Sequence, residues 1–203
     1  MRAFFDVDTQ NDFMGKNGAL YVNGAEDIHN LLKELTKYAM NNGIPIVGSV
    51  DAHSRDDPEL KVFGPHCLKD TYGGLKIPET YHVRTLRIPN KRIDNLAKLA
   101  ECLRTQKYRA LYLEKQTTDV FSNPNTEELL RNLGADEFVV YGVATDFCVR
   151  DAVLGLLKRG YNVSIVGDAT RAVNLTPIDG QASLELMVAS GAKLLKASEV
   201  LTG

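Results

Sequence analysis

The strongest constraint on the fold is a repeated alternation between short apolar runs and longer segments in which apolar residues recur at helical spacing. The clearest run, Phe138–Tyr141, has the composition of a strand that is buried on both faces. Strands that alternate with helices imply βαβ units, so we predict a three-layer α/β/α fold with a mainly parallel, Rossmann-like central sheet of about six strands. The predicted strands are residues 3–7, 44–50, 81–88, 110–113, 138–141 and 162–166, with 192–195 as a candidate edge strand, and the predicted helices are residues 25–42, 92–106, 126–133, 147–158 and 177 or 179 to 190.

The size and composition of the chain favour a soluble globular protein. A length of 203 residues suits a single domain over residues 1–203, with 44% hydrophobic and 25% charged residues. The formal net charge of -2 provides no electrostatic basis for binding nucleic acid or a membrane surface. No apolar run is long enough to cross a bilayer, and Asp6 comes too early for a secretory signal. Three widely spaced cysteines do not form a disulfide framework, so we expect a reducing, cytoplasmic location.

Cys148 follows the strand at 138–141 and lies at the start of the next predicted helix. Gly142 ends the strand, and Thr145 or Asp146 is a suitable cap for the helix. The crevice at the carboxyl ends of parallel strands is where open α/β sheets bind ligands. Free amide groups and the helix dipole would lower the pKa of a thiol at that place. The alternative is that Cys148 is a small buried apolar residue, as most free cysteines are.

Polar residues follow four of the predicted strands. They are Asp8, Asp51 with His53, Lys115 and Cys148. Each of them alone fits a loop or surface residue, but in a parallel sheet all four positions open onto one edge. A carboxylate can take the proton of a thiol, an ammonium group can stabilise the resulting anion, and a thiolate can attack a carbonyl carbon. The set therefore indicates nucleophilic catalysis by a cysteine.

The long segment 51–78 has no periodic apolar pattern and contains candidate metal ligands. Asp51 and His53 alternate along an extended chain and so can face one ion. Glu59 and His66 lie further along the same segment, and together these side chains form a mixed nitrogen and oxygen site suited to Zn²⁺, Mn²⁺ or Fe²⁺. The alternative is a set of loop residues with separate hydrogen bonds. Glycine-rich phosphate-binding motifs are absent from the sequence, so it does not support a nucleotide cofactor.

Five motifs in order along the chain resemble the isochorismatase-like cysteine hydrolases. The nicotinamidase branch of this family, also called pyrazinamidases, is the most similar because of its Asp-x-His and Pro-His-Cys motifs. The resemblance covers nearly the whole chain and implies the isochorismatase-like α/β fold. The motifs are Asp8-Thr9-Gln10-Asn11-Asp12-Phe13, Asp51-Ala52-His53, Pro65-His66-Cys67, Lys115 after a strand, and Gly142-Val143-Ala144-Thr145-Asp146-Phe147-Cys148-Val149.

The resemblance implies a catalytic triad of Asp8, Lys115 and Cys148. In the family the cysteine attacks a carboxamide carbon, the aspartate accepts the thiol proton, and the lysine keeps this pair ionised. Family members also have a cis peptide bond at the position of Val143–Ala144. Their oxyanion hole is formed by the backbone N–H groups that correspond to Ala144 and Cys148.

The resemblance also implies one divalent metal ion, Zn²⁺ first, with Mn²⁺ or Fe²⁺ as alternatives. Asp51, His53 and His66 match the family's ligands. The fourth protein ligand varies in the family, and here Glu59 is the candidate, with the Asp56–Asp57 pair as competitors.

Phe13 and Phe63 match the two positions whose aromatic rings flank the substrate in this family. Many members have tryptophan at the position of Phe63.

The implied reaction is hydrolysis of nicotinamide to nicotinate and ammonia, so the expected partner is a small-molecule carboxamide, and homo-oligomerisation is left open. The alternatives are a metal-independent sister amidase, an isochorismatase-type hydrolase, and a non-catalytic member that binds a ligand or uses Cys148 as a redox sensor.

Overall fold

One seven-stranded sheet forms the centre of the computed structural model, which describes residues 1–202. The strand order is β3-β4-β2-β1-β5-β6-β7, and every pairing between these strands is parallel. The predicted parallel α/β fold is confirmed. The number of strands exceeds the predicted six because the candidate edge strand at 192–195 is present, as β7, and pairs with β6. The strands are β1 (Arg2–Val7), β2 (Ile46–Asp51), β3 (Thr85–Ile88), β4 (Ala110–Lys115), β5 (Glu137–Val143), β6 (Asn162–Arg171) and β7 (Lys193–Leu195).

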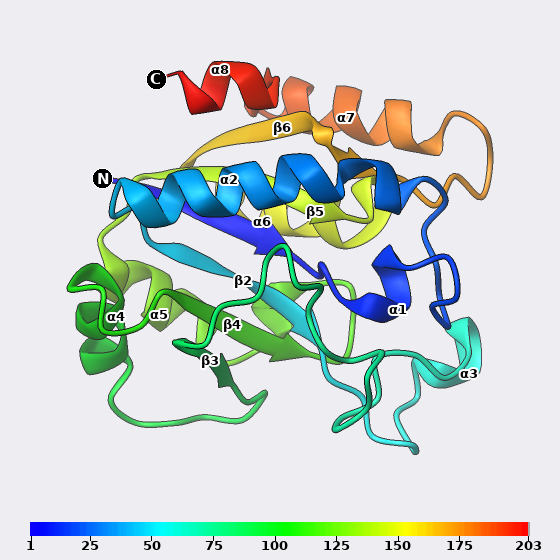
Figure 1. Ribbon diagram of the computed structural model, residues 1–203, viewed down its shortest axis with the longest axis horizontal. Coiled ribbons are helices and arrows are strands. Elements are labelled where there is room, and N and C mark those ends of the chain that lie inside the picture. The colour runs from blue at the N-terminus through cyan, green and yellow to red at the C-terminus, as the bar shows by residue number, and fades with distance from the viewer. Residues whose placement is uncertain (203) are drawn as a thin grey trace.

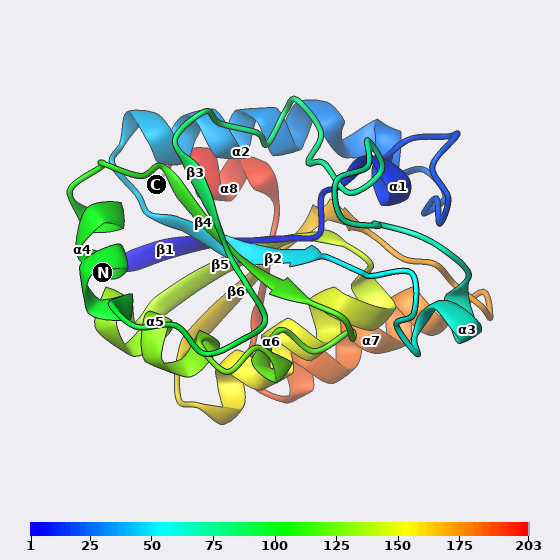
Figure 2. The same cartoon turned by 90° about the horizontal axis from the view of Figure 1, so that it is seen from below.

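Helices cover both faces of this sheet (Figures 1 and 2). Figure 2 shows α2 and α8 on one face and α4 to α7 on the other. No helix within residues 1–202 combines the length and the apolar character that a membrane crossing requires. The helices are α1 (Asn11–Met14), α2 (His29–Asn41), α3 (Leu60–Phe63), α4 (Leu96–Arg104), α5 (Thr126–Leu133), α6 (Arg150–Lys158), α7 (Asp179–Ala189) and α8 (Ala197–Leu201), with 3₁₀ turns at Ala25–Ile28 and Val120–Ser122 and a π-helical turn at Thr145–Val149.

Two apolar cores fill the space between the sheet and its two helical layers. Neighbouring residues of one strand point to opposite cores: Phe5 packs on Phe138 with ring centroids 6.1 Å apart, whereas Phe4 packs on Tyr141 at 6.0 Å. Both faces of the central strands are therefore buried, which explains their nearly continuous apolar composition.

Several predicted boundaries differ from the structure. The strand predicted at 81–88 begins only at Thr85, because residues 81–84 are mostly exposed and pair with no strand. The strand predicted at 162–166 extends to Arg171. Its pairing with β5 is irregular after Val140, where the register shifts, and then resumes with Thr170 opposite Gly142. The helix predicted from Phe147 begins at Arg150, after the π-helical turn, and the short helices α1, α3 and α8 were not predicted.

A glycine allows β5 to end close to β1. Gly142 has φ +116°, and a Cβ atom at this position would lie 2.1 Å from the carbonyl oxygen of Val7. Any side chain would force the two strands apart at their carboxyl ends. This glycine thus sets how closely the residues that follow the two strands approach each other.

A buried ion pair joins the C-terminal part of the segment 51–78 to β1. The ammonium group of Lys76 lies 2.9 Å from Asp6 Oδ2 and 4.0 Å from the ring centroid of Tyr112. The same carboxylate accepts hydrogen bonds from the hydroxyl groups of Tyr112 and Thr9. The backbone of Lys76 forms an antiparallel bridge with Gln10, so both its side chain and its backbone hold this segment against the sheet.

We predict that Lys76→Met lowers the free energy of unfolding by about 3–5 kcal/mol, because it leaves the Asp6 carboxylate buried without a counter-charge. Denaturant unfolding measures the effect. Lys16→Met is the matched control, since Lys16 forms an exposed ion pair with Glu26, and its effect is expected to be far smaller. Equal losses in the two variants would show that the buried pair has no special role.

Candidate active site

Four adjacent strands bring the polar residues of the sequence motifs to one edge of the sheet. Lys115 ends β4, Asp51 ends β2, Asp8 follows β1, and Cys148 lies in the turn after β5. Asp51 and Lys115 are direct partners in the register of β2 and β4. The chain adds β2, β3 and β4 on one side of β1 and β5, β6 and β7 on the other. These residues therefore lie at the point where the strand order reverses, the usual ligand site of this architecture.

The ammonium group of Lys115 lies at the centre of this cluster. Its Nζ atom is 2.8 Å from Asp8 Oδ2 and 3.4 Å from Cys148 Sγ, and it also contacts Asp51 Oδ1. Lys115 and Asp8 are 0% exposed, and Cys148 is 9% exposed. A carboxylate, an ammonium group and a thiol thus lie within contact distance in a largely water-free environment.

Burial and charge determine the protonation of these groups. Burial raises the pKa of the Asp8 carboxyl, although the Lys115 charge opposes the shift. Burial alone would lower the pKa of Lys115, but the charges of Asp51 and Asp8 outweigh it and raise that pKa well above its ordinary value. Asp8 is therefore a stronger base than an exposed aspartate, and Lys115 keeps its charge.

The pKa of the Cys148 thiol is shifted in the opposite direction to the sequence-based prediction, which expected it to be lowered. Burial raises its pKa well above the ordinary value and outweighs the Lys115 charge. Cys148 lies in the π-helical turn Thr145–Val149, so it is not at the exposed first turn of a regular helix. The thiol consequently keeps its proton in this state of the protein, and its reactivity requires a base beside it.

The backbone around the cluster has two unusual conformations. The peptide bond between Val143 and Ala144 is cis, the geometry that the family resemblance implied. Asp8 has φ +48°, in the left-handed region that few non-glycine residues adopt. The hydroxyl group of Ser49 on β2 donates a hydrogen bond of 2.7 Å to Asp8 Oδ1 and so holds this carboxylate in place.

Asp51, His53 and His66 form a compact set of candidate metal ligands beside the catalytic cluster. One ligand atom from each lies within 4.8 Å of the other two. Asp51 Oδ2 is 3.4 Å from His66 Nε2 and 3.7 Å from His53 Nε2. Ligand atoms that bind one first-row metal ion at about 2.1 Å lie roughly 3.4 Å apart in a tetrahedral site. The spacing therefore fits such an ion.

Glu59, the candidate for the fourth protein ligand, faces this set. Its Oε2 atom is 3.8 Å from His53 Nε2, and both atoms are buried without a hydrogen-bond partner within residues 1–202. Burial and the Asp51 charge raise the pKa of the Glu59 carboxyl. A bound cation would satisfy both unpartnered atoms and relieve the repulsion between the carboxylates. Asp56 is exposed, and Asp57 contacts the other ring nitrogen of His53.

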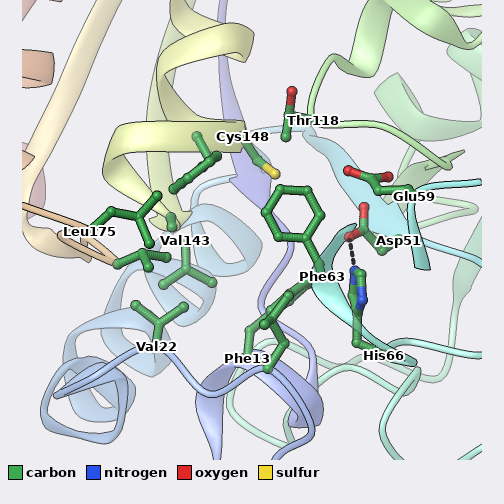
Figure 3. A pocket seen from close by; sticks show the side chains of 14 residues that line it. Phe13, Val22, Asp51, Glu59, Phe63, His66, Thr118, Val143, Cys148 and Leu175 are labelled. Atoms are coloured by element: carbon green, nitrogen blue, oxygen red, sulfur yellow. Dashed lines mark ion pairs between the residues drawn. The ribbon is translucent and has the colours of Figure 1, made fainter. Parts of the chain in front are cut away.

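A cavity of about 150 Å³ connects the thiol with the candidate metal ligands. A cavity of this volume is known to hold a benzene molecule, so its size suits a single aromatic ring. Phe13 and Phe63 both line it, with ring centroids 5.6 Å and 6.4 Å from the ring of His66. Figure 3 shows Phe63 between Cys148 and His66, with Phe13 further from the thiol.

Six further lining residues escaped the sequence analysis: Leu20, Val22, Thr118, Phe147, Val173 and Leu175. Most lie in loops without a periodic pattern, and only Phe147 belongs to a motif that was singled out.

Gln10 was also missed as a support of the site. Its side-chain amide donates to the carbonyl oxygen of Asp51 and accepts from the Asp51 N–H, which fixes the backbone of this residue.

Asp146 holds one wall of the cavity. Its two carboxylate oxygens accept hydrogen bonds from the N–H groups of Val173 at 2.9 Å and Asn174 at 2.7 Å. The Asp146 side chain is buried, whereas the segment that it holds is exposed. This motif residue therefore shapes the pocket through the loop after β6, without lining the cavity itself.

The fold and the site together define a Rossmann-like α/β protein with a carboxylate, an ammonium group and a thiol at one sheet edge. A family model described as the Isochorismatase domain matches residues 2–199, so the chain belongs to the isochorismatase family. This match confirms the family that the motifs predicted.

Relatives of known name are similar over most of the chain. A nicotinamidase from Escherichia coli is 26% identical over 95% of this chain and 93% of its own length. An Arabidopsis thaliana protein named "Probable inactive nicotinamidase" is 25% identical over 84% of this chain and 80% of its own. The crystal structure of a nicotinamidase from Bacillus subtilis superimposes with a TM-score of 0.76 at 26% identity, covering 96% of this chain and 99% of that one.

We predict that Asp146→Ala speeds hydrogen–deuterium exchange at the amides of Val173 and Asn174 and lowers the free energy of unfolding by about 1–2 kcal/mol, because two N–H groups lose their acceptor. Asp168→Ala is the matched control, since Asp168 accepts a hydrogen bond from the N–H of Ala197 at the start of α8. Unchanged exchange at residues 173 and 174 would mean that Asp146 does not hold the segment after β6 in place.

Proposed function

We propose that this protein is a nicotinamidase, a hydrolase that converts nicotinamide and water to nicotinate and ammonia. The observation that carries the proposal is a ring-sized cavity with the Cys148 thiol on one side and the donor set of Asp51, His53 and His66 on another. A pyridine carboxamide has the two matching groups, a carbonyl carbon for the thiol and a ring nitrogen for a metal ion. The names of the relatives from Escherichia coli and Bacillus subtilis support the same activity.

The first chemical step joins Cys148 to the substrate. Asp8 takes the thiol proton, helped by the burial that raises its pKa, while the sulfur attacks the carboxamide carbon and forms a C–S bond. Lys115 stabilises the negative charge on sulfur from a distance of 3.4 Å. Asp8 then passes the proton to the amide nitrogen, the C–N bond breaks, and ammonia leaves a thioester on the enzyme.

The second step returns the enzyme to its starting state. Asp8 takes a proton from water, whose oxygen attacks the thioester carbon. The C–S bond breaks, the sulfur takes the proton back from Asp8, and the product acid gives its remaining proton to water and leaves as nicotinate. In both steps we assign the oxyanion hole to the backbone N–H groups of Ala144 and Cys148, which would lower the barrier by about 3 kcal/mol.

We propose that Asp51, His53, His66 and Glu59 hold one divalent ion. When bound, the ion would coordinate the pyridine nitrogen and so orient the ring. Zn²⁺ suits a mixed histidine and carboxylate set best, with Mn²⁺ or Fe²⁺ as alternatives. Phe13 and Phe63 would pack against the ring and exclude water from the reacting carbonyl group.

A metal-independent amidase is the main alternative within the family. The buried and unpartnered atoms His53 Nε2 and Glu59 Oε2 argue against it, because a site without an ion would leave both unsatisfied. A purely ligand-binding or redox-sensing member would have no use for a base and an ammonium group around the thiol. The assays below separate these alternatives.

We predict that the purified protein releases ammonia from nicotinamide and that Cys148→Ala lowers kcat by about 10⁴-fold or more, because the nucleophile is lost. Asp8→Asn keeps the shape of the side chain but not the base, and it is expected to lower kcat by roughly 10²–10⁴-fold. Cys102→Ala, a cysteine on α4 remote from the cavity, serves as the control and should retain wild-type activity. Full activity of Cys148→Ala would refute the mechanism.

We predict that removal of divalent metal with a chelator abolishes most nicotinamide turnover and that added Zn²⁺, Mn²⁺ or Fe²⁺ restores it. The physical reason is the loss of ring orientation beside Cys148. Elemental analysis before and after chelation gives the metal content. Turnover that persists unchanged in metal-free protein would favour the metal-independent amidase.

A further inference from the structure

Asp57 contacts His53 at the ring nitrogen that does not face the other candidate metal ligands. Asp57 Oδ2 lies 3.2 Å from His53 Nδ1 and accepts a second hydrogen bond, of 2.8 Å, from the N–H of Ser54. We infer that Asp57 is a positioning residue of the metal centre: it holds the ring of His53 with its proton on Nδ1 and leaves Nε2 free to bind the ion. The inference rests on the proposed function, since it requires a metal ion at this site.

The proton assignment follows from the chemistry of the contact. A carboxylate can only accept hydrogen bonds, so Nδ1 must be the donor. A histidine that binds a metal ion through one nitrogen is neutral and has one N–H group, so with that N–H group at Nδ1 the lone pair for the ion is on Nε2. This atom faces Asp51 Oδ2 at 3.7 Å and Glu59 Oε2 at 3.8 Å, too far for hydrogen bonds, and it has no partner within residues 1–202. A lone pair buried among carboxylate oxygens is suited to a cation.

The local backbone makes Asp57 a rigid support. Its own N–H group donates to the carbonyl oxygen of Ser54 at 3.1 Å, which closes a tight turn directly after His53. His66 is supported differently, because its Nδ1 atom lies 2.9 Å from the carbonyl oxygen of Gly64. His53 is thus the histidine of this pair whose outer nitrogen contacts a side chain. A carboxylate in this position orients the ring and raises the basicity of the metal-binding nitrogen.

Asp56 is a natural control for this contact. It has the same charge and lies in the same turn, but its side chain is exposed. Within residues 1–202 it forms neither an ion pair nor a hydrogen bond with His53. Substitution of Asp56 changes the local charge as much as substitution of Asp57 does, without removing the acceptor of the histidine proton.

Zn²⁺ affinity of the metal-free proteins, measured by competition with a chelator, is the first readout. Asp57→Ala is expected to weaken binding by about 10–100-fold, the usual effect of losing such a support. Asp57→Asn should have a smaller effect, because its amide oxygen still accepts from both donors. Asp56→Ala should bind Zn²⁺ as the wild type does.

The proton position on His53 is the second readout, and a merely structural role of Asp57 would not change it. Nitrogen-15 NMR of the metal-free proteins should show the Nδ1–H form of His53 in the wild type and in Asp56→Ala. Asp57→Ala should shift the ring toward the Nε2–H form. At saturating Zn²⁺ this variant should regain nicotinamide turnover, because the ion then selects the required form.

The outcomes separate this inference from the proposed function. If Asp57→Ala binds Zn²⁺ like the wild type while Asp51→Ala does not, the role of Asp57 is refuted and the metal site stands. The inference also fails if the affinity falls without a change in the proton position. A wild-type protein that binds no Zn²⁺, Mn²⁺ or Fe²⁺ would overturn both the inference and the proposed metal site.

Discussion

The structure at the carboxyl edge of the sheet depends on the buried ammonium group of Lys115. Two carboxylates, those of Asp8 and Asp51, hold this charge in a place where burial alone would disfavour it. A buried charge that loses its partner costs several kcal/mol, so the three side chains are stable together and none of them is stable there alone. The parallel register sets Asp51 opposite Lys115, and Asp8 directly follows the neighbouring strand β1, so the fold brings the three side chains together.

Asp51 connects the two parts of the site. One of its oxygens contacts Lys115, and the other lies 3.4 Å from His66 Nε2 in the candidate metal set. Its backbone is held on both sides by the side chain of Gln10. The thiol cluster and the proposed metal ion therefore share one carboxylate.

Loops form most of the cavity wall, and carboxylates hold these loops in place. Asp12 accepts a hydrogen bond from the N–H of Cys67, Asp146 holds the segment after β6, and Asp6 pairs with Lys76. Each contact joins segments that are far apart in the sequence. Specific contacts with distant segments therefore hold the walls of the pocket, although these walls have little regular secondary structure.

The sequence by itself determined the alternating α/β architecture, the strands that form the centre of the sheet, and the set of polar residues at its carboxyl edge. It could do so because apolar periodicity and strand-end position are local properties, and because the motifs from Asp8 to Cys148 identify the family. Only the tertiary structure decided the seventh strand, the π-helical turn around Cys148 and the orientation of Glu59 toward His53 and of Asp57 toward its other nitrogen. It also decided that burial raises the pKa of the Cys148 thiol. These features arise from contacts between distant segments and from the exclusion of water, which no local pattern in the chain encodes.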